Sequence, residues 1–330
     1  MKAVLIAVRT FGKYTTKPLE YLKENGMIPE IVDVNQLNVI KEKIKEVDAL
    51  IIGAKPDLTA DMIESSNLKI IARHGVGLDN VDIKAATARK IPVTITKGAN
   101  TESVSEMTVA LLFALSRNLV HYHTDLVRNH QWPDGVGSEI FGKTLGLLGF
   151  GEIARKVASK ALCLGMKVIA TDPFVSNKQM MNLGVKGVEM DVLLEKSDFL
   201  SIHVPLNEKT RNLIGESELK KMKPSSYLIN TSRGSIVDEK ALTRALKERW
   251  IAGAAVDVFQ KEPPNFNSEL FKCENLIATP HIAAHTFEAI SNMNMMAAKA
   301  VVDFFNGHIP HCVVNRELFP ILWPDREIPM

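Results

Sequence analysis

The sequence predicts an α/β protein built from two doubly wound parallel-sheet domains with a cleft between them. Short apolar runs alternate with helical segments along most of the chain. Such runs, bounded by turn residues, are typical of strands covered by helices on both faces of a parallel sheet. The length of 330 residues suits two domains. One of the apolar runs also leads into a glycine-rich turn, which is considered below.

The first hundred residues predict the first of these sheets. Strands are expected at Lys2–Val8, Pro29–Val34, Ala49–Gly53, Leu68–Ala72 and Val93–Thr96. Helices are expected at Lys17–Asn25, which is followed by Gly26, and at Ile83–Arg89. Strands that alternate with helices in this way indicate βαβ units.

The middle of the chain begins with a long apolar-rich helix, Thr101–Ser116, which Asn100 or Thr101 could cap. The next segment, His121–Ile140, breaks the pattern and carries polar residues, glycines and a proline. We expect it to be an extended excursion outside the core. Two interpretations stay open at this point, namely a surface loop and an arm that packs on another subunit.

A second α/β series runs from Lys143 to about Thr279. Its expected strands are Leu145–Leu148, Lys167–Thr171, Phe199–His203, Tyr227–Asn230, Ala254–Val258 and Leu276–Ala278, with helices such as Ile153–Leu164 and Glu239–Glu248 between them. A last helix, Ala289–Phe305, ends before Gly307 and should lead the chain back to the first domain. The tail Phe319–Met330 is expected to be loosely held.

These elements give the expected domain boundaries. Residues 1–100 and 287–330 form one domain, and residues 101–286 form the other, with the possible arm at 121–140. The second domain is inserted in the middle of the first.

Composition and charge exclude several classes of function. Hydrophobic residues make up 46% and charged residues 24% of the chain, and the formal net charge is only +2. We therefore expect neither nucleic acid nor a membrane as a partner. The three cysteines share no metal-type spacing, so no metal site is predicted. No signal segment or membrane span is apparent, and we expect a cytoplasmic protein that acts on small molecules.

The strand at Leu145–Leu148 leads into a glycine turn and then a helix. Gly149 permits the tight turn, Gly151 lets the backbone approach a pyrophosphate closely, and the small Ala154 allows the helix to pack on the strand. The N–H groups around Glu152 and Ile153 would face the phosphates. This arrangement predicts a Rossmann-like dinucleotide site.

The next strand ends in Asp172, at about the spacing expected for a contact to the ribose. A carboxylate there can accept hydrogen bonds from both ribose hydroxyls and would repel a 2′-phosphate. No arginine follows within Pro173–Gln179. The sequence therefore favours NAD over NADP as the cofactor.

Three further strands are each followed by a polar residue that could reach the nicotinamide. Arg233 could bind a carboxylate and polarise the neighbouring carbonyl. His281 could take or return the hydroxyl proton. Glu262 could bind the other imidazole nitrogen and orient the ring. Together these residues predict oxidation of a 2-hydroxy acid or reduction of a 2-keto acid.

With these motifs the chain resembles the D-isomer-specific 2-hydroxyacid dehydrogenases from about Leu50 to Asn315. The resemblance rests on Gly149-Phe150-Gly151-Glu152-Ile153-Ala154, Asn230-Thr231-Ser232-Arg233-Gly234, Asp257-Val258 through Glu262-Pro263, and Pro280-His281. It implies catalytic roles for Arg233, Glu262 and His281. It also implies that Asp257 holds the nicotinamide carboxamide. The expected cofactor contacts are Gly149, Phe150, Gly151, Glu152, Ile153, Asp172, His203, Val204, Pro205, Thr210, Thr231, Ser232 and Asp257.

Within that family, the sequence is most similar to short phosphoglycerate dehydrogenases. The segment Arg73–Asp82 resembles their substrate loop, which implies substrate contacts from Arg73, Val76, Gly77, Asn100 and Arg233. By the same resemblance the arm at 121–140 is a dimer contact, and the protein is a homodimer.

One departure leaves the phosphate end of the substrate open. Only Lys55 stands near Gly53 and Ala54, where phosphoglycerate members often carry another arginine. In addition, Ala283 stands where those members commonly have glycine. The leading expectation is 3-phosphoglycerate, and reductases of glyoxylate, hydroxypyruvate or D-lactate type are the alternatives. An alternative of another class is an NAD-sensing scaffold of the transcriptional corepressor type.

Overall fold

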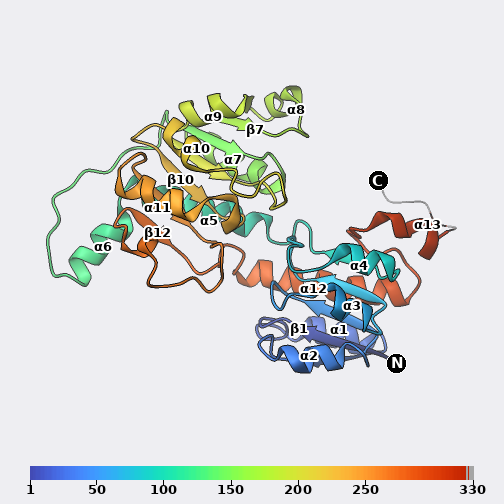
Figure 1. Ribbon diagram of the computed structural model, residues 1–330. Coiled ribbons are helices and arrows are strands. Elements are labelled where there is room, and N and C mark those ends of the chain that lie inside the picture. The colour runs from blue at the N-terminus through green and yellow to red at the C-terminus, as the bar shows by residue number, and fades with distance from the viewer. Residues whose placement is uncertain (325, 327–330) are drawn as a thin grey trace. The chain divides into compact units, whose positions relative to one another are not determined.

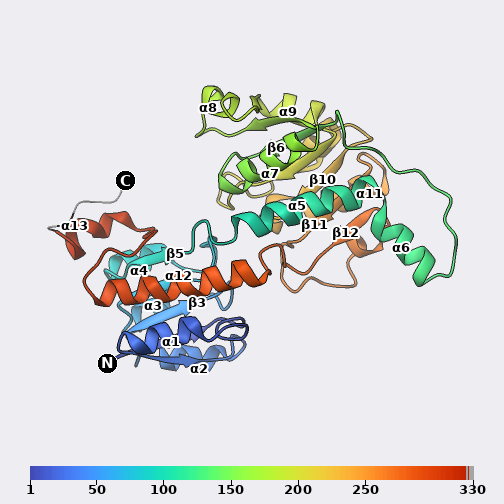
Figure 2. The same ribbon diagram turned by 180° about the vertical axis from the view of Figure 1, so that it is seen from behind.

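The computed structural model describes residues 1–324 and 326, and the chain divides into two compact units (Figures 1 and 2). Unit 1 comprises Met1–Asn100 and His285–Met330, and unit 2 comprises Thr101–Ala284. Each unit contains its own parallel sheet. The predicted α/β class with two parallel-sheet domains is confirmed.

Unit 1 is built on a five-stranded parallel sheet in the order β2-β1-β3-β4-β5. The strands are β1 (Lys2–Ala7), β2 (Met27–Ile31), β3 (Ala49–Ile52), β4 (Ile70–Arg73) and β5 (Val93–Ile95). The helices are α1 (Lys17–Glu24), α2 (Leu37–Lys43), α3 (Ala60–Glu64), α4 (Ile83–Ala88), α12 (Phe287–Phe305) and α13 (Phe319–Leu322), with a 3₁₀ turn, η3, at Arg316–Leu318. This strand order is one of the two common doubly wound arrangements.

Successive residues of the unit 1 strands point to opposite faces of the sheet, and each face has its own core. Leu5, Leu50 and Ile71 pack with side chains of α2, α3 and α4. Val4, Ile6 and Ile51 pack instead with side chains of α1 and α12. Because both faces are covered, the strands are apolar throughout, as the sequence indicated.

The predicted strand Pro29–Val34 was wrong by two to three residues. β2 begins at Met27 because its pairing with β1 starts at Lys2 opposite Met27, directly after Gly26. Pro29 lies inside the strand. Proline is tolerated there because β2 is an edge strand, so the missing N–H of Pro29 can face the side of β2 that has no neighbouring strand.

Unit 2 is built on a seven-stranded parallel sheet in the order β12-β11-β10-β9-β6-β7-β8. The strands are β6 (Thr144–Leu148), β7 (Lys167–Thr171), β8 (Lys186–Gly187), β9 (Phe199–Ile202), β10 (Tyr227–Asn230), β11 (Gly253–Val256) and β12 (Leu276–Ala278). The helices are α5 (Thr101–Ser116), α6 (Leu119–Val127), α7 (Glu152–Cys163), α8 (Asn177–Met181), α9 (Met190–Lys196), α10 (Glu216–Lys221) and α11 (Glu239–Lys247), with 3₁₀ turns η1 (Gly234–Ile236) and η2 (Glu269–Lys272).

Two helical layers cover this second sheet. Side chains of α9, α10 and α11 pack on one face, and side chains of α5, α7 and α8 pack on the other. The order of strands reverses between β6 and β9. In doubly wound sheets, dinucleotides bind beyond the carboxyl ends of the strands at this reversal.

The segment after α5 differs from the predicted extended excursion. Its first part is the helix α6, Leu119–Val127, none of whose residues is buried. Residues 130–140 follow without regular structure, and both ribbon views show this stretch running away from the sheet of unit 2 (Figures 1 and 2). The helix was missed because its apolar residues have no core to face, so they form no buried stripe.

The C-terminal tail is also better packed than expected. Phe319 and Trp323 are buried, and their rings meet edge to face at 5.8 Å in a small cluster with Val313. The expectation of a loosely held tail was therefore wrong for these residues. The part of the prediction that concerns residue 325 and residues 327–330 lies outside the described residues.

Candidate active site

The glycine turn after β6 has the geometry that the sequence motif requires. Gly149 has φ +91°, and a Cβ there would lie 2.9 Å from the carbonyl carbon of His203. A Cβ at Gly151 would meet nothing within 4 Å, so the space beside the turn is open. Gly151 precedes α7, and no side chain caps that helix. The turn therefore leaves room and helix N–H groups for a pyrophosphate.

Asp172 lies beside this turn, after β7. Its Oδ2 accepts the Phe150 N–H at 2.7 Å, and its Oδ1 accepts the Phe174 N–H at 2.8 Å. These two bonds hold the carboxylate in one orientation while leaving each oxygen a further lone pair. The residues of this edge thus fit the diphosphate and ribose of a nicotinamide dinucleotide.

The segment His203–Pro205 follows β9, the strand that pairs with β6, and two hydroxyl groups hold it in place. Ser232 Oγ donates to the carbonyl of Val204 at 2.6 Å, and Thr210 Oγ1 donates to that of Pro205 at 2.6 Å. Desolvation lowers the pKa of His203 to about 4, and its Nε2 lies 2.9 Å from Ser201 Oγ. His203 is therefore neutral at pH 7.

Asn230, the last residue of β10, shapes the turn that carries Arg233. Its amide nitrogen donates to the Arg233 carbonyl at 3.0 Å, and its Oδ1 accepts the Ser232 N–H at 3.0 Å. Thr231 Oγ1 lies 3.1 Å from Thr108 Oγ1 on α5. Sequence reasoning assigned no role to Asn230, although a buried polar residue that closes an apolar strand was a signal for one.

Gly234 brings this turn against the loop of Glu262. A Cβ at Gly234 would lie 2.0 Å from the carbonyl carbon of Phe259, so only glycine fits there. The Phe259 N–H donates to Glu262 Oε1 at 3.1 Å. The turn of Arg233 and the loop of Glu262 are therefore in direct backbone contact.

Glu262 and His281 form a close pair, with Glu262 Oε2 lying 2.7 Å from His281 Nδ1. Burial acts to raise the pKa of Glu262. The hydrogen bond and charge of His281, the Phe259 N–H and the charge of Arg233 outweigh it, so the pKa of Glu262 is lowered. Glu262 is thus an ionised partner for the imidazole, and the Nε2 atom of His281 is not used by this pair.

Asp257 follows β11, and its carboxylate is enclosed by the chain after β12. It accepts hydrogen bonds from the Thr279 hydroxyl and from the N–H groups of Ile282 and Ala283. The side chain is fully buried. The side chain of Asp257 is therefore already engaged by three donors within the protein.

The predicted substrate residues of unit 1 gather at the carboxyl ends of β3, β4 and β5. Arg73 is buried, and its guanidinium donates to the His74 carbonyl. Gly75 has φ +132°, a backbone conformation that residues with a side chain rarely adopt, and a Cβ there would lie 2.3 Å from that guanidinium. Val76 and Gly77 follow on the partly exposed part of the loop.

Two asparagines complete this edge of unit 1. Asn80 donates to the carbonyls of Gly53 at 3.0 Å and Pro56 at 3.1 Å, which ties the loop to the segment after β3. Asn100 is buried, and its Oδ1 has no hydrogen-bond partner within the described part of the chain.

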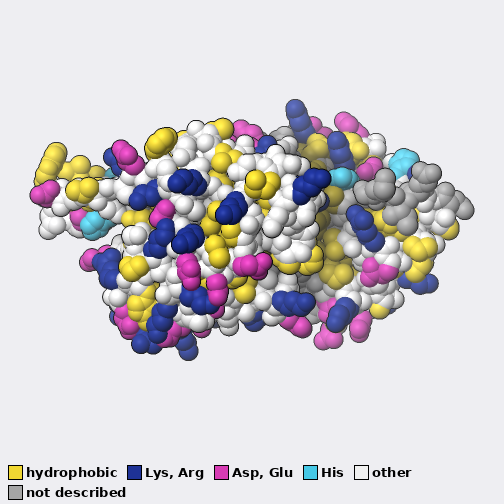
Figure 3. Space-filling model, turned by 90° about the horizontal axis from the view of Figure 1, so that it is seen from above, with side chains coloured by type: hydrophobic (Ala, Val, Ile, Leu, Met, Phe, Trp, Pro, Cys, Tyr) yellow, Lys and Arg dark blue, Asp and Glu magenta, His cyan; other side chains and the backbone are white. Residues whose placement is uncertain are grey.

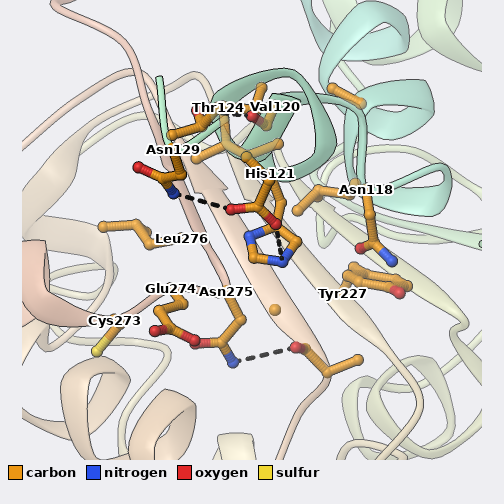
Figure 4. Close-up of a pocket in the computed structure, with 16 residues that line it drawn as sticks. Asn118, Val120, His121, Thr124, Asn129, Tyr227, Cys273, Glu274, Asn275 and Leu276 are labelled. Atoms are coloured by element: carbon orange, nitrogen blue, oxygen red, sulfur yellow. Dashed lines mark hydrogen bonds and ion pairs between the residues drawn. The ribbon is translucent and has the colours of Figure 1, made fainter. Parts of the chain in front are cut away.

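A separate pocket of about 330 Å³ lies at the amino ends of strands of the unit 2 sheet, opposite the carboxyl ends that carry Arg233 and His281 (Figure 4). Tyr227, Gly253 and Leu276, which begin β10, β11 and β12, line its floor. His121 on α6 points into it and pairs with Asp125 at 3.3 Å. No sequence motif predicted this pocket, and it is distinct from the end of the sheet that carries Arg233 and His281.

The described residues contain neither a metal-type cluster nor a helix that could span a membrane. No group of three or more His, Cys, Asp or Glu side chains is placed to hold a metal ion. No helix in the described ranges is both long and apolar enough to cross a bilayer.

Comparison with known proteins identifies the family. The family model described as D-isomer specific 2-hydroxyacid dehydrogenase, NAD binding domain, matches residues 109–283. A glyoxylate reductase of Thermococcus litoralis is 42% identical over 290 residues, which are 85% of this chain and 87% of that protein. A D-3-phosphoglycerate dehydrogenase of Archaeoglobus fulgidus is 38% identical over 292 residues, which are 88% of this chain and 55% of that protein.

A solved structure agrees with these relatives. The D-lactate dehydrogenase of Aquifex aeolicus, complexed with NAD and lactic acid, superposes with a TM-score of 0.83 at 27% identity, covering 92% of this chain and 96% of that one. The fold, the glycine turn beside Asp172 and the matched family domain lead to one conclusion. This chain belongs to the D-isomer specific 2-hydroxyacid dehydrogenases and is an NAD-dependent oxidoreductase.

Proposed function

We propose that this enzyme reduces a small 2-keto acid of the glyoxylate type, with Arg233, Glu262 and His281 as its catalytic residues. The catalytic assignment rests on the 2.7 Å distance between His281 Nδ1 and Glu262 Oε2. The charge of Arg233 also acts on the Glu262 carboxylate. When bound, the nicotinamide cofactor supplies or accepts the hydride at C2 of the substrate.

The residues have separate tasks in this reaction. Arg233 binds the substrate carboxylate and polarises the adjacent carbonyl. Glu262 accepts from Nδ1 of His281 and so fixes the ring and its tautomer. Nε2 of His281 then gives a proton to the carbonyl oxygen, or takes one from the hydroxyl in the reverse direction.

The other proposed contacts divide between the two units. In unit 2 the turn from Gly149 to Ile153 and Asp172 bind the dinucleotide, together with His203–Pro205, Thr210, Thr231 and Ser232. In unit 1 the loop with Val76 and Gly77 offers backbone N–H groups to the substrate carboxylate, with Asn100 nearby. Arg73 stabilises that loop, because its guanidinium donates a hydrogen bond to the carbonyl of His74. We also propose that residues 1–100 and 287–330 are the substrate domain.

Glyoxylate is favoured because it needs no cation beyond Arg233. Lys55 is the only cation of the segment 53–55, and the buried Arg73 is engaged with its own loop. The relative named glyoxylate reductase also matches over nearly its whole length. The second candidate is 3-phosphoglycerate, which Lys55 and the relative from Archaeoglobus fulgidus favour.

The substrate and the role of His281 can be tested together. Purified protein is mixed with NADH and, in turn, glyoxylate, hydroxypyruvate, pyruvate and 3-phosphohydroxypyruvate, and NADH oxidation is followed. Glyoxylate should give the highest kcat/KM. His281→Ala should lower kcat by about two to four orders of magnitude with NADH binding nearly unchanged, because the proton donor alone is lost.

The exposed His308 provides the matched control. His308→Ala should keep full activity. A higher kcat/KM with 3-phosphohydroxypyruvate would reverse the order of substrates, and normal turnover by His281→Ala would remove His281 from catalysis.

We further propose that the protein is a cytoplasmic homodimer, in which α6 and residues 128–140 form an arm that packs on a second copy. Several large apolar side chains of this segment are exposed, among them Leu126 and, at 88% exposure, Trp132. Figure 3 shows hydrophobic side chains on the projecting end at its left, where Figure 1 has α6. Apolar surface of this kind in a soluble protein marks an interface.

A further inference from the structure

Asp257 and Thr279 leave the unit 2 sheet side by side. β11 and β12 run parallel, and Val256 pairs with Ala278 in their register. The Thr279 N–H donates to the Val256 carbonyl at 2.9 Å, so the ladder continues one step beyond the strands. At this point the Thr279 hydroxyl donates to Asp257 Oδ1 at 2.6 Å. The two side chains are therefore joined just before the chain turns to His281.

The chain beyond Thr279 wraps around the same carboxylate. The Ile282 N–H donates to Asp257 Oδ1 at 2.9 Å, and the Ala283 N–H donates to Oδ2 at 2.8 Å. The His281 N–H donates to the main-chain carbonyl of Asp257 at 2.8 Å. Asp257 accordingly binds the backbone N–H groups of His281 and of the two residues after it, and the side chain of Thr279 before it.

His281 needs this restraint because its backbone is strained. Its φ is +55°, in the left-handed region that residues other than glycine rarely adopt. Such a conformation persists only where the surroundings impose it. The same conformation sets the direction in which the imidazole leaves the backbone, and hence its 2.7 Å contact with Glu262.

From these contacts we infer that Thr279 and Asp257 are positioning residues, which hold the loop 279–283 so that His281 meets Glu262 and the substrate. The inference rests on the proposed function in one respect, namely that His281 transfers the proton. It assigns a role to Thr279, for which no sequence motif predicted one. It also gives Asp257 a role different from the carboxamide contact that the family resemblance implied.

The charge and burial of Asp257 support this role. Its buried carboxylate accepts one hydroxyl and two backbone N–H groups, all from the segment 279–283. Hydrogen bonds to an ionised acceptor are about twice as strong as those between neutral groups. A neutral asparagine could not replace it, because its NH₂ group would oppose a backbone N–H.

Thr279→Val and Thr279→Ser form the matched pair that tests the inference. Valine keeps the shape of threonine but removes the hydroxyl, while serine keeps the hydroxyl. We expect Thr279→Val to lower kcat for glyoxylate reduction about 10- to 100-fold, because a small misplacement of a catalytic group has effects of this size. The dissociation constant of NADH should change less than twofold. Thr279→Ser should recover most of the kcat.

Two readouts separate positioning from a merely structural role. The loss in Thr279→Val should fall on kcat, with the KM for glyoxylate changed less than twofold, because the groups proposed to bind the substrate carboxylate are untouched. In ¹⁵N-histidine NMR of the protein without substrate, the Nδ1 signal of His281, assigned with His281→Gln, should shift in Thr279→Val and return in Thr279→Ser. Asp257→Asn should act in the same direction, and circular dichroism shows whether each variant is folded.

Each result decides a different question. If Thr279→Val keeps the wild-type kcat and Nδ1 signal, the inference is overturned even though His281→Ala is inactive. If Asp257→Asn and Thr279→Val weaken NADH binding in parallel with kcat, Asp257 acts at the cofactor and the inference fails. If His281→Ala is fully active, the proposed function fails, and the NMR signal alone then tests whether Thr279 holds the loop.

Discussion

Single residues in this protein combine a contact to the backbone with a proposed contact to a ligand. Asp172 is the clearest example, because each carboxylate oxygen accepts one backbone N–H and keeps a lone pair for another donor. The backbone bonds fix where the negative charge lies. A 2′-phosphate would have to approach that fixed charge, and the two ribose hydroxyls of NAD would not.

Replacement of Asp172 should therefore change the choice of cofactor. Asp172→Ala should lower kcat/KM for NADH about 10- to 100-fold, as expected for loss of hydrogen bonds to a charged group. It should lower kcat/KM for NADPH much less, because repulsion is also lost. Asp191→Ala removes a surface carboxylate paired with Lys221 and serves as the control. An unchanged ratio of the two cofactors would mean that the ribose is recognised elsewhere.

At the residue scale, the roles of the catalytic residues stay predictions, but the contact between two of them is observed. Arg233, Glu262 and His281 were chosen because each follows an apolar run, and the pair of Glu262 and His281 is now seen at 2.7 Å. The bond between Asp257 and Thr279 could not be predicted. It depends on the register of β11 against β12, which neither strand's own sequence specifies.

At the scale of elements, the strands were more predictable than the short helices. Both faces of each sheet are covered, so strands appear as continuous apolar runs with clear ends. The sequence analysis assigned no helix to the regions of α2, α3, α8, α9 and α10, which have five to seven residues each. Helices of one or two turns show too little periodicity to be recognised.

The arm gives a prediction at this scale. In analytical ultracentrifugation, the wild-type protein should have twice the 36.5 kDa mass of the chain. Replacing Leu126 and Trp132 together by serine should shift the population toward monomer, because their exposed apolar area is proposed to be buried in the dimer. Phe174→Ser removes an equally exposed aromatic side chain outside the arm and should leave sedimentation unchanged. A monomeric wild-type protein would contradict the proposal.

At the scale of the whole molecule, one buried histidine links the stability of unit 1 to pH. Burial, together with the charge of Arg73, lowers the pKa of His74 to about 4. The unfolded chain binds that proton at about pH 6.5. Between these two values the unfolded state holds more protons, so the stability of unit 1 rises with pH and is lost as the pH falls from 6.5 to 4.

The expected slope from this histidine approaches about 1.4 kcal/mol per pH unit. His74→Gln should reduce the loss of hydrogen-exchange protection in β3 and β4 between pH 6.5 and 4.5, compared with wild type. Ile71→Val, a core change in β4, should lower protection by about 0.5–1.5 kcal/mol at every pH and keep the slope. Equal slopes for His74→Gln and wild type would exclude His74 as the cause.

The insertion of unit 2 into unit 1 has a consequence for how the chain is made. One face of the unit 1 sheet is covered by α12, whose Ala297 and Val301 pack with Val4 and Ile51. A ribosome that adds about 5–20 residues per second completes the sheet roughly 10–40 s before it completes α12. Unit 2 is a continuous segment that is synthesised during that interval. Until α12 has been made, the face of the unit 1 sheet that it covers stays without its partner helix.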